Sequence, residues 1–260
     1  MEKAQPAPLR AEISFWDIIK SVDSIHISYS EKLRNLQAKY EWTILDARSL
    51  VFYNICSLAE NLSLTLTAII FTKHNGLHSK DWWRDWAGYQ DVDRAFRQIP
   101  DFDTYINDQV RQMIHRVQEQ LAITTQIYIE AFIRNTARQM GIEQNMFWKL
   151  KKAFLVDELG LTEEEILPLT IFQNLKNSLH NKGIHYNERE GELRFNLDSF
   201  EFAFDHTEAV KMGWDHYRVL LLAASEVLLM IVEHPKVVAL PEYSDRNIVV
   251  LKEGDEDIED

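Results

Sequence analysis

The sequence predicts a mainly α-helical protein, an up-and-down helical bundle of long helices with a small β-hairpin before the last helix. Through most of the 260 residues, apolar side chains recur three or four positions apart, which is the spacing of one helix face. Only shortly before the last apolar stripe do they recur two apart, as in a strand. No repeat or linker divides the chain, so we expect one helical domain over residues 11–240 and an acidic C-terminal tail over residues 241–260.

The first half of the chain predicts three long helices. One apolar stripe covers Trp16–Tyr40, and a second starts at Val51 and ends before Gly76, which follows an asparagine in a typical C-terminal signal. The third stripe runs over Ile106–Met140 and stops at Gly141. Stripes of this length and width are typical of antiparallel bundle helices.

The second half begins with shorter helices. One is expected around Phe147–Leu155. Thr162–Glu165 forms a capping box, in which the Thr hydroxyl and the Glu carboxylate satisfy free amides at a helix start. The next helix is therefore expected to begin at about Thr162 or Leu167, to run to Asn181 and to be closed by Gly183.

Strand spacing follows, and then a last helix. Ile184–Tyr186 and Leu193–Phe204 alternate on either side of Glu190-Gly191, which predicts a small hairpin or meander around that dipeptide. The final apolar stripe covers Trp214–Ile231 and ends at His234-Pro235.

The charge and the cysteine content restrict the classes of function that we expect for this protein. With 28 Lys and Arg against 41 Asp and Glu, the net charge is −13, so binding of nucleic acid would need a local basic patch. One cysteine, Cys56, excludes an internal disulfide framework. Residues 49–72 carry only Glu60 as a charge, but Asn, Ser and Thr interrupt them too often for a lipid-facing helix. Met1–Arg10 does not have the pattern of a signal peptide, so we expect a cytoplasmic protein that does not enter a membrane.

Common catalytic motifs are not found, and no cofactor is expected. The glycines have neither phosphate-loop nor dinucleotide-binding spacing. His74 and His78 have the spacing of two metal ligands on a helix, but Gly76 lies between them, so a helix end is the simpler interpretation. Trp82, Trp83 and Trp86 beside Arg84 would suit base stacking, although such residues more often pack a loop onto a core.

Two features predict a site for anions. Arg134 and Arg138 lie four apart, and with the lysines of 149–152 they predict a local phosphate-binding patch or, alternatively, a solvated face. On the predicted helix ending near residue 181, Gln173, Lys176 and His180 fall within about 60° of one another, with Asn177 close behind. Lysine and an imidazolium at a helix C-terminus suit contact with phosphate, and histidine can act as acid or base toward an RNA 2′-hydroxyl. Alternatively, His180 only caps the helix.

The segment Lys176-Asn-Ser-Leu-His-Asn-Lys-Gly-Ile184 resembles the Arg-Asn-Ser-Ile-His-Asn-Asn-Gly type of motif in the HEPN superfamily, especially its bacterial abortive-infection-like members. The resemblance is strongest over residues 166–238. It implies a helical bundle that dimerises through its motif helices. It also implies, for active members, a metal-independent ribonuclease site of an Arg, a polar residue and a His from both subunits. Lys176 takes the Arg position and Asn177 the polar one, while His180 comes one residue early.

The expected function is therefore that of a HEPN-like RNA- or nucleotide-binding homodimer of a bacterial stress, toxin or antiviral defence system which, if it is an enzyme, is a metal-independent endoribonuclease. The catalytic candidates are Lys176 for phosphate, and Asn177 and His180 for the 2′-hydroxyl or leaving group. The binding candidates are Gln173, Asn181, Lys182, His185, Arg134 and Arg138. The alternative is a catalytically silent HEPN-like module for dimerisation or for contact with a partner protein.

Overall fold

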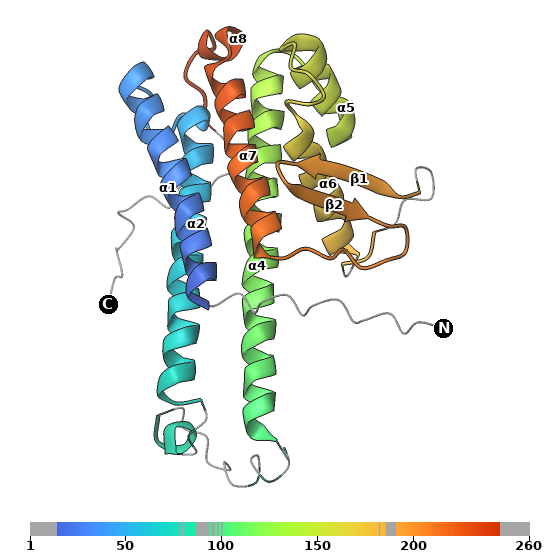
Figure 1. The fold of residues 1–260 in the computed structure, drawn as a ribbon. Coiled ribbons are helices and arrows are strands. Elements are labelled where there is room, and N and C mark those ends of the chain that lie inside the picture. The colour runs from blue at the N-terminus through green and yellow to red at the C-terminus, as the bar shows by residue number, and fades with distance from the viewer. Residues whose placement is uncertain are drawn as a thin grey trace, which may run out of the picture.

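Long helices that run side by side dominate the computed structural model (Figure 1). It describes residues 15–77, 79, 81–86, 94, 97, 99, 101–181, 183–185 and 191–244. The elements are α1 (Phe15–Tyr40), α2 (Ala47–Asn75), the π-helical turn η1 (Trp82–Trp86), α4 (Phe102–Gln139), α5 (Phe147–Lys151), the π-helical turn η2 (Lys152–Glu158), α6 (Leu167–His180), β1 (Leu193–Leu197), β2 (Phe200–Phe204), α7 (Trp214–Glu233) and α8 (Pro235–Val238). The predicted fold class, mainly α with one hairpin before the last long helix, is confirmed.

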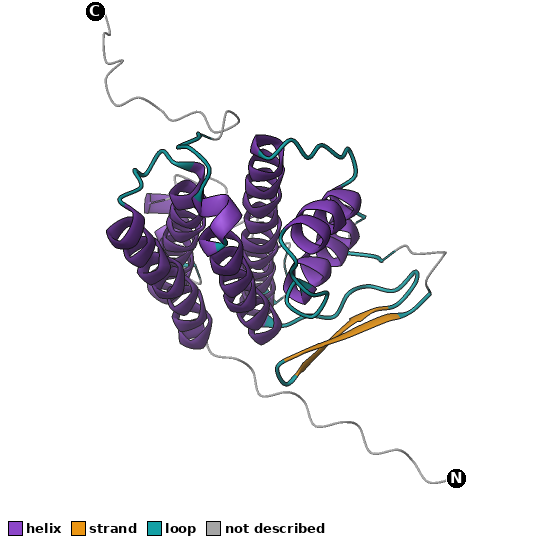
Figure 2. Cartoon of the chain, turned by 90° about the horizontal axis from the view of Figure 1, so that it is seen from above, coloured by secondary structure: helices purple, strands orange, loops and turns teal. Residues whose placement is uncertain are grey.

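The bundle is formed by α1, α2, α4 and α7, and α6 lies against α4 and α7. Seen from above, the hairpin forms a flap on the side of the bundle where α6 lies (Figure 2). α2 and α4 continue past the other helices and form a two-helix projection at the bottom of Figure 1. This arrangement places α6 beside α4, and the hairpin beside α6.

The predicted stripes make the core. On α1, Val22, Ile25 and Tyr29 are fully buried, and the Tyr29 hydroxyl donates to the Leu221 carbonyl oxygen of α7 at 3.0 Å. Two predicted members are wrong, since Trp16 of α1 leaves 58% and Met113 of α4 leaves 46% of the surface exposed.

Two predicted helix ends are confirmed. α2 ends at Asn75, and α4 ends at Gln139, just before Gly141, which has the left-handed φ of 77°. Gly76 is needed for another reason, since the ring of Trp82 occupies the space that a Cβ atom would take. Trp82 therefore packs a loop against the end of α2, the commoner of the two roles considered for the tryptophans.

The shorter helices follow the prediction closely. Thr162 and Glu165 make the reciprocal capping-box bonds, at 2.7 Å from the Thr162 amide and 3.2 Å from the Glu165 amide. Regular helix starts at Leu167, the second of the two predicted starts, and the chain leaves α6 through Gly183 at φ 81°.

The hairpin turns at a different place from the one predicted. β1 and β2 pair antiparallel from Leu193↔Phe204 to Leu197↔Phe200, so the turn lies at Asp198-Ser199 and not around Glu190-Gly191. Asp198 adopts φ 52°, a conformation that a short polar residue tolerates and that lets the strands reverse within two residues. Of the phenylalanines of β2, Phe202 and Phe204 are fully buried in the core, while Phe200 is half-buried.

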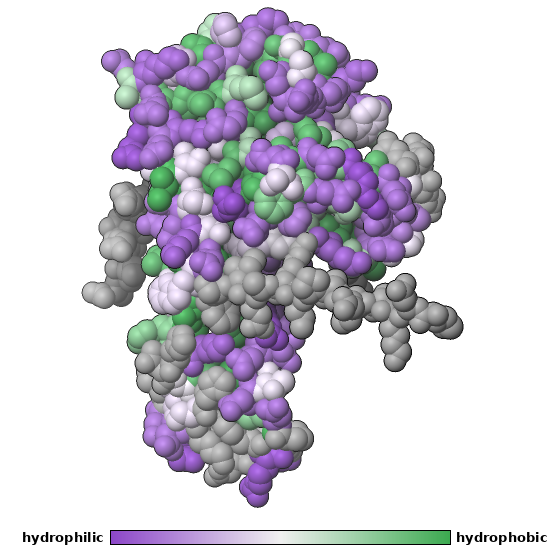
Figure 3. Space-filling view, viewed as in Figure 1, coloured by the Kyte–Doolittle hydropathy of each residue, from purple (hydrophilic) through white to green (hydrophobic). Residues whose placement is uncertain are grey.

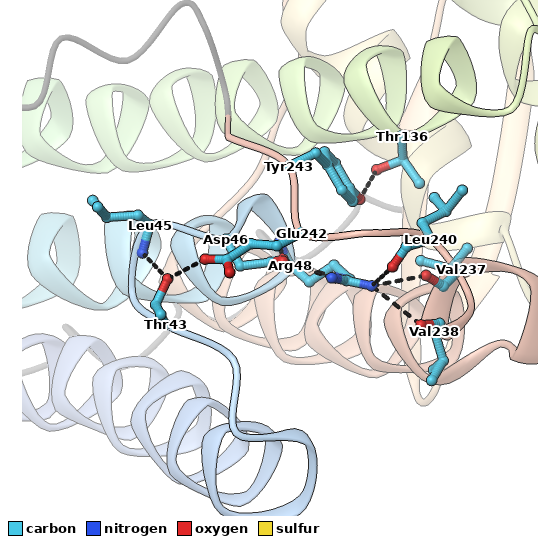
Figure 4. A network of polar contacts seen from close by, with 10 residues as sticks. All are labelled: Thr43, Leu45, Asp46, Arg48, Thr136, Val237, Val238, Leu240, Glu242 and Tyr243. Atoms are coloured by element: carbon cyan, nitrogen blue, oxygen red, sulfur yellow. Dashed lines mark hydrogen bonds and ion pairs between the residues drawn. The ribbon is translucent and has the colours of Figure 1, made fainter.

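A buried arginine fastens the start of α2 to the end of α8 (Figure 4). The guanidinium of Arg48 is bidentate to Asp46, with bonds of 2.8 and 2.6 Å, and it also donates to the carbonyl oxygens of Val237 and Leu240 at 3.0 and 3.1 Å. The Arg48 residue is 1% exposed. The network ties the start of α2 to the carbonyl end of α8.

Beyond α8, the chain remains part of the bundle as far as Ser244. Tyr243 is buried, its hydroxyl lies 2.8 Å from that of Thr136 on α4, and its carbonyl oxygen accepts from the Ala47 amide at 2.8 Å (Figure 4). Residues 241–244 therefore pack against the helical bundle.

α2 is unusually apolar on its outer face as well. Of the described helices, it alone is long and apolar enough to cross a membrane, a criterion of length and composition that core helices also meet. Its inner face packs in the bundle as predicted, while Tyr53, Leu64 and Phe71 are exposed. Elsewhere, hydrophilic residues cover most of the described face shown in Figure 3.

We expect Arg48→Met to lower the free energy of unfolding by about 3–5 kcal/mol, because it leaves the Asp46 carboxylate buried without its cation. Arg48→Lys should recover only part of the lost free energy of unfolding, since a lysine cannot satisfy the carboxylate and the carbonyl oxygens together. Urea unfolding followed by circular dichroism measures both. Arg111→Met, which removes an exposed pair to Asp108 at 3.7 Å, is the control. Equal stability of Arg48→Met and the wild type would contradict the proposed importance of the network.

Candidate functional site

One carboxylate joins α4 to α6 at the predicted site. Glu130 accepts from the Lys176 ammonium at 2.7 Å through one oxygen, and from Nε and Nη2 of Arg134 at 3.0 and 2.7 Å through the other. The Glu130 side chain is only 16% exposed. The ammonium of Lys176 is therefore held at a fixed place beside α4.

Helix geometry explains how these groups meet. Glu130 and Arg134 lie one turn apart on α4, where side chains four positions apart are neighbours. On α6, Phe172 and Leu175 are buried in the core, which turns the adjacent Lys176 toward α4. The apolar face of α6 thus sets the direction of the cation.

The pKa of Glu130 is lowered. Burial of the carboxyl alone would raise its pKa, but the hydrogen bonds and charges of Lys176 and Arg134 outweigh burial and hold the pKa below its ordinary value. Glu130 is therefore ionised at neutral pH and neutralises part of the local positive charge.

Two adjoining surface pockets open around these residues, and Arg134 and Arg138 line both. The first has a volume of about 320 Å³ and is lined by Ile127, Glu130, Ala131, Arg134, Asn135, Arg138 and Lys176. The second has a volume of about 240 Å³ and is lined by Arg134, Arg138, Ile142, Glu143, Gln144, Asn145 and Leu150. Three cations face two carboxylates here, which leaves a locally positive site on an acidic protein.

The two arginines differ in how strongly contacts within the protein hold their side chains. Arg134 also donates to the carbonyl oxygens of Gln144 and Asn145 at 3.1 and 3.3 Å, so it supports the loop after α4. The side chain of Arg138 is 59% exposed and, among the described residues, pairs only with Glu143, at 3.8 Å. Arg138 is therefore the side chain best able to turn its donors toward a ligand.

The other predicted site residues, on α6 and just beyond it, lie in different environments. Gln173 is half-buried and Asn177 is exposed on the same helix as Lys176. Asn181 is exposed and donates to the Asn177 carbonyl oxygen at 3.0 Å, which is a helix-capping contact. His180 is the last residue of α6, and its side chain, like the whole of Lys182, lies outside the described residues.

His185 does not lie on this surface, which corrects its predicted binding role. It is 3% exposed, its Nδ1 lies 3.1 Å from the Ser178 hydroxyl, and its ring packs on Phe204 at 5.4 Å between centroids. The reason is the turn at Gly183, after which the chain folds back and the His185 amide donates to the Glu208 carbonyl oxygen. His185 fastens the hairpin to α6.

The lysines of 149–152 do not act together. Lys151 is buried and donates to the Thr170 hydroxyl, and burial lowers its pKa to about 8. Lys149 and Lys152 are exposed, as a solvated face requires.

Among the described residues, no group of three His, Cys, Asp or Glu side chains could hold a metal ion. The alternative of a metal site at His74 and His78 concerns side chains outside the described residues, since the structure describes neither imidazole.

Glu130 is the important residue that the sequence analysis did not identify. Its signal was present in part, since Glu130 and Arg134 have the spacing of an ion pair on a helix. Its second partner, Lys176, lies 46 positions further along the chain. Only the packing of α6 on α4 reveals that contact.

We expect Glu130→Gln to lower the free energy of unfolding at pH 7 by about 1–3 kcal/mol, because two partly buried cations lose their shared charged acceptor. Since the carboxyl has a lowered pKa when folded, its contribution is complete above the ordinary glutamate pKa of about 4.3 and is lost as the pH falls through the folded pKa. Urea unfolding at pH 7 and at several lower values tests this. The difference between variant and wild type should shrink in acid, whereas the exposed control Glu60→Gln should change little. A difference that does not depend on pH would rule out the charge as its cause.

Comparisons of the chain with protein-family models, with curated proteins and with solved structures found no match.

Proposed function

We propose that this chain is a HEPN-like helical protein that binds the phosphate groups of RNA or of a nucleotide in the two pockets between α4, α6 and the loop after α4. The observation that carries the proposal is the convergence of Lys176, Arg134 and Arg138 on one pocket, which two different helices bring together. The resemblance of the α6 segment to the HEPN motif is the second support.

The chemistry of the site suits phosphate. Arginine presents paired donors that match phosphate oxygens, and the exposed Arg138 has donors to offer. Lys176 supplies a point charge that Glu130 holds in place. Because the two pockets share both arginines, they suit ligands that carry two linked phosphates, such as a nucleoside diphosphate or consecutive phosphates of an RNA strand.

The net charge of −13 sets a limit on how such a ligand binds. A strongly acidic protein repels a long polyanion, so binding would depend on a few local contacts rather than on an extended basic surface. We therefore expect a weak dependence on salt, corresponding to about two or three neutralised phosphates.

In the catalytic form of this proposal, the chain is a metal-independent endoribonuclease in which two motif helices of a cytoplasmic homodimer face each other. Lys176 would hold the phosphate, and Asn177 and His180 would act on the 2′-hydroxyl or the leaving group. A role in bacterial stress, toxin or antiviral defence rests on the resemblance alone.

A catalytically silent dimerisation module is the second candidate, and the Lys176–Glu130 pair favours it. The carboxylate lies 2.7 Å from the ammonium that would otherwise hold the reacting phosphate. A cation already neutralised stabilises developing negative charge less well, because the carboxylate opposes the same charge. The structure of α6 would then be retained for packing.

Binding is tested with a fluorescein-labelled 12-nucleotide single-stranded RNA in an anisotropy titration. We expect Arg138→Gln and Lys176→Gln each to weaken binding about 5- to 30-fold, as the loss of one charged contact worth about 1–2 kcal/mol requires. Arg111→Gln, on the exposed surface of α4, is the matched control and should bind RNA like the wild type. Competition by ADP and by inorganic phosphate shows which phosphate source the site prefers. Affinities that are the same in all variants would refute the site.

Catalysis is tested separately by incubating a longer RNA with purified protein in EDTA. In the catalytic form, wild type cleaves and His180→Ala does not, while His180→Ala still binds RNA because Lys176 and Arg138 remain. An inert wild type that still binds RNA would refute the catalytic form and leave the binding site, whereas an inert wild type that binds no RNA would favour the silent module. Light scattering of the same preparations measures whether the chain is a dimer.

A further inference from the structure

A further depression lies away from the two pockets lined by Arg134 and Arg138, and its charge is opposite to theirs. It has a volume of about 580 Å³ and is bounded by the start of α6, the tip of the hairpin and the middle of α7. In Figure 1 the hairpin tip reaches across to α7, and hydrophobic residues come to the surface over α7 in the same view of Figure 3. We call this depression the hairpin groove.

The floor of the hairpin groove is largely apolar. α7 contributes one stripe from Val219 to Met230, in which the half-buried Leu222 is a central residue. A stripe of this length extends about 16 Å along the helix axis, or about three helical turns. The hairpin adds the half-buried side chains of Leu197 and Phe200 on the other side.

The rim of the hairpin groove is acidic. Four carboxylates line it, against the single cation of Arg218. Glu226 is paired with Lys32 at 2.8 Å, and Glu165 is used in the capping box. Glu164 and Asp198 are exposed, on the α6 side and at the hairpin tip.

We infer that the hairpin groove docks an amphipathic helix of a partner protein whose apolar face is flanked by lysine or arginine residues. Its floor fits about three turns of a helix, and a row of apolar side chains at helical spacing would bury against Leu222, Met230 and Phe200. The acidic rim complements basic flanks, so it selects the partner and speeds encounter. The same rim repels RNA and anionic membranes, which separates this surface from the phosphate pockets.

The test uses the full chain and a labelled synthetic peptide of 14 residues, with leucines on one helical face and lysines elsewhere. A scrambled peptide of the same composition without a single apolar face, and a peptide with glutamate in place of lysine, are the comparison probes. We expect the first peptide to bind at least ten times more tightly than either of the others. Equal binding of the scrambled peptide would overturn the inference, because general attraction between opposite charges would then suffice.

Variants locate the binding. Glu164→Lys combined with Asp198→Asn should weaken binding of the leucine–lysine peptide at least tenfold, and Leu222→Glu should do the same. Asparagine at 198 keeps a residue that tolerates the left-handed turn, so the hairpin is preserved. The control Glu31→Lys with Glu60→Lys makes charge reversals at two exposed sites on α1 and α2. Equal losses in the control and the groove variants would place the binding elsewhere, and circular dichroism confirms that each variant is folded.

Discussion

The structure depends on a charge that is almost completely removed from water. Arg48 is stable in the core only because Asp46, the carbonyl oxygens at the end of α8 and the ring of Trp42, at 4.1 Å, together replace its hydration. This requirement fixes α2 against α8, and Tyr243 continues the network to Thr136 of α4. Thr136 lies within two turns of Glu130, so the same network sets the position of the helix that carries the candidate site.

At that site, one carboxylate serves both the fold and the proposed function. Glu130 satisfies Lys176 and Arg134 and so joins α6 to α4, but in doing so it removes much of the positive charge that a phosphate would use. What remains is concentrated on Arg138, which is exposed and weakly paired. Specificity for phosphate in this protein would therefore rest on a single exposed arginine beside a half-buried ion pair, rather than on a broad basic surface.

The helices, their ends and the hairpin could be predicted because each has a local cause. Apolar periodicity locates the helices, the capping box precedes α6, and glycines with positive φ follow α4 and α6. The position of the hairpin turn was not predicted, because Asp198-Ser199 lies within an otherwise regular alternation. The site depended on contacts between distant residues: Lys176 meets Glu130 and His185 turns inward only because α6 packs as it does. Helix periodicity alone gives the face of a side chain, not the neighbour it meets.

The two ends of α6 border the two proposed surfaces, and the charges there match the direction of its dipole. Glu163–Glu165 precede the amino end, where negative charge is favourable, and Lys176 lies in the turn before the carboxyl end, where positive charge is favourable. The two surfaces can therefore have opposite charges without destabilising the helix between them. Because α6 is only 14 residues long and lies against both α4 and α7, a rigid shift of it would alter both surfaces at once.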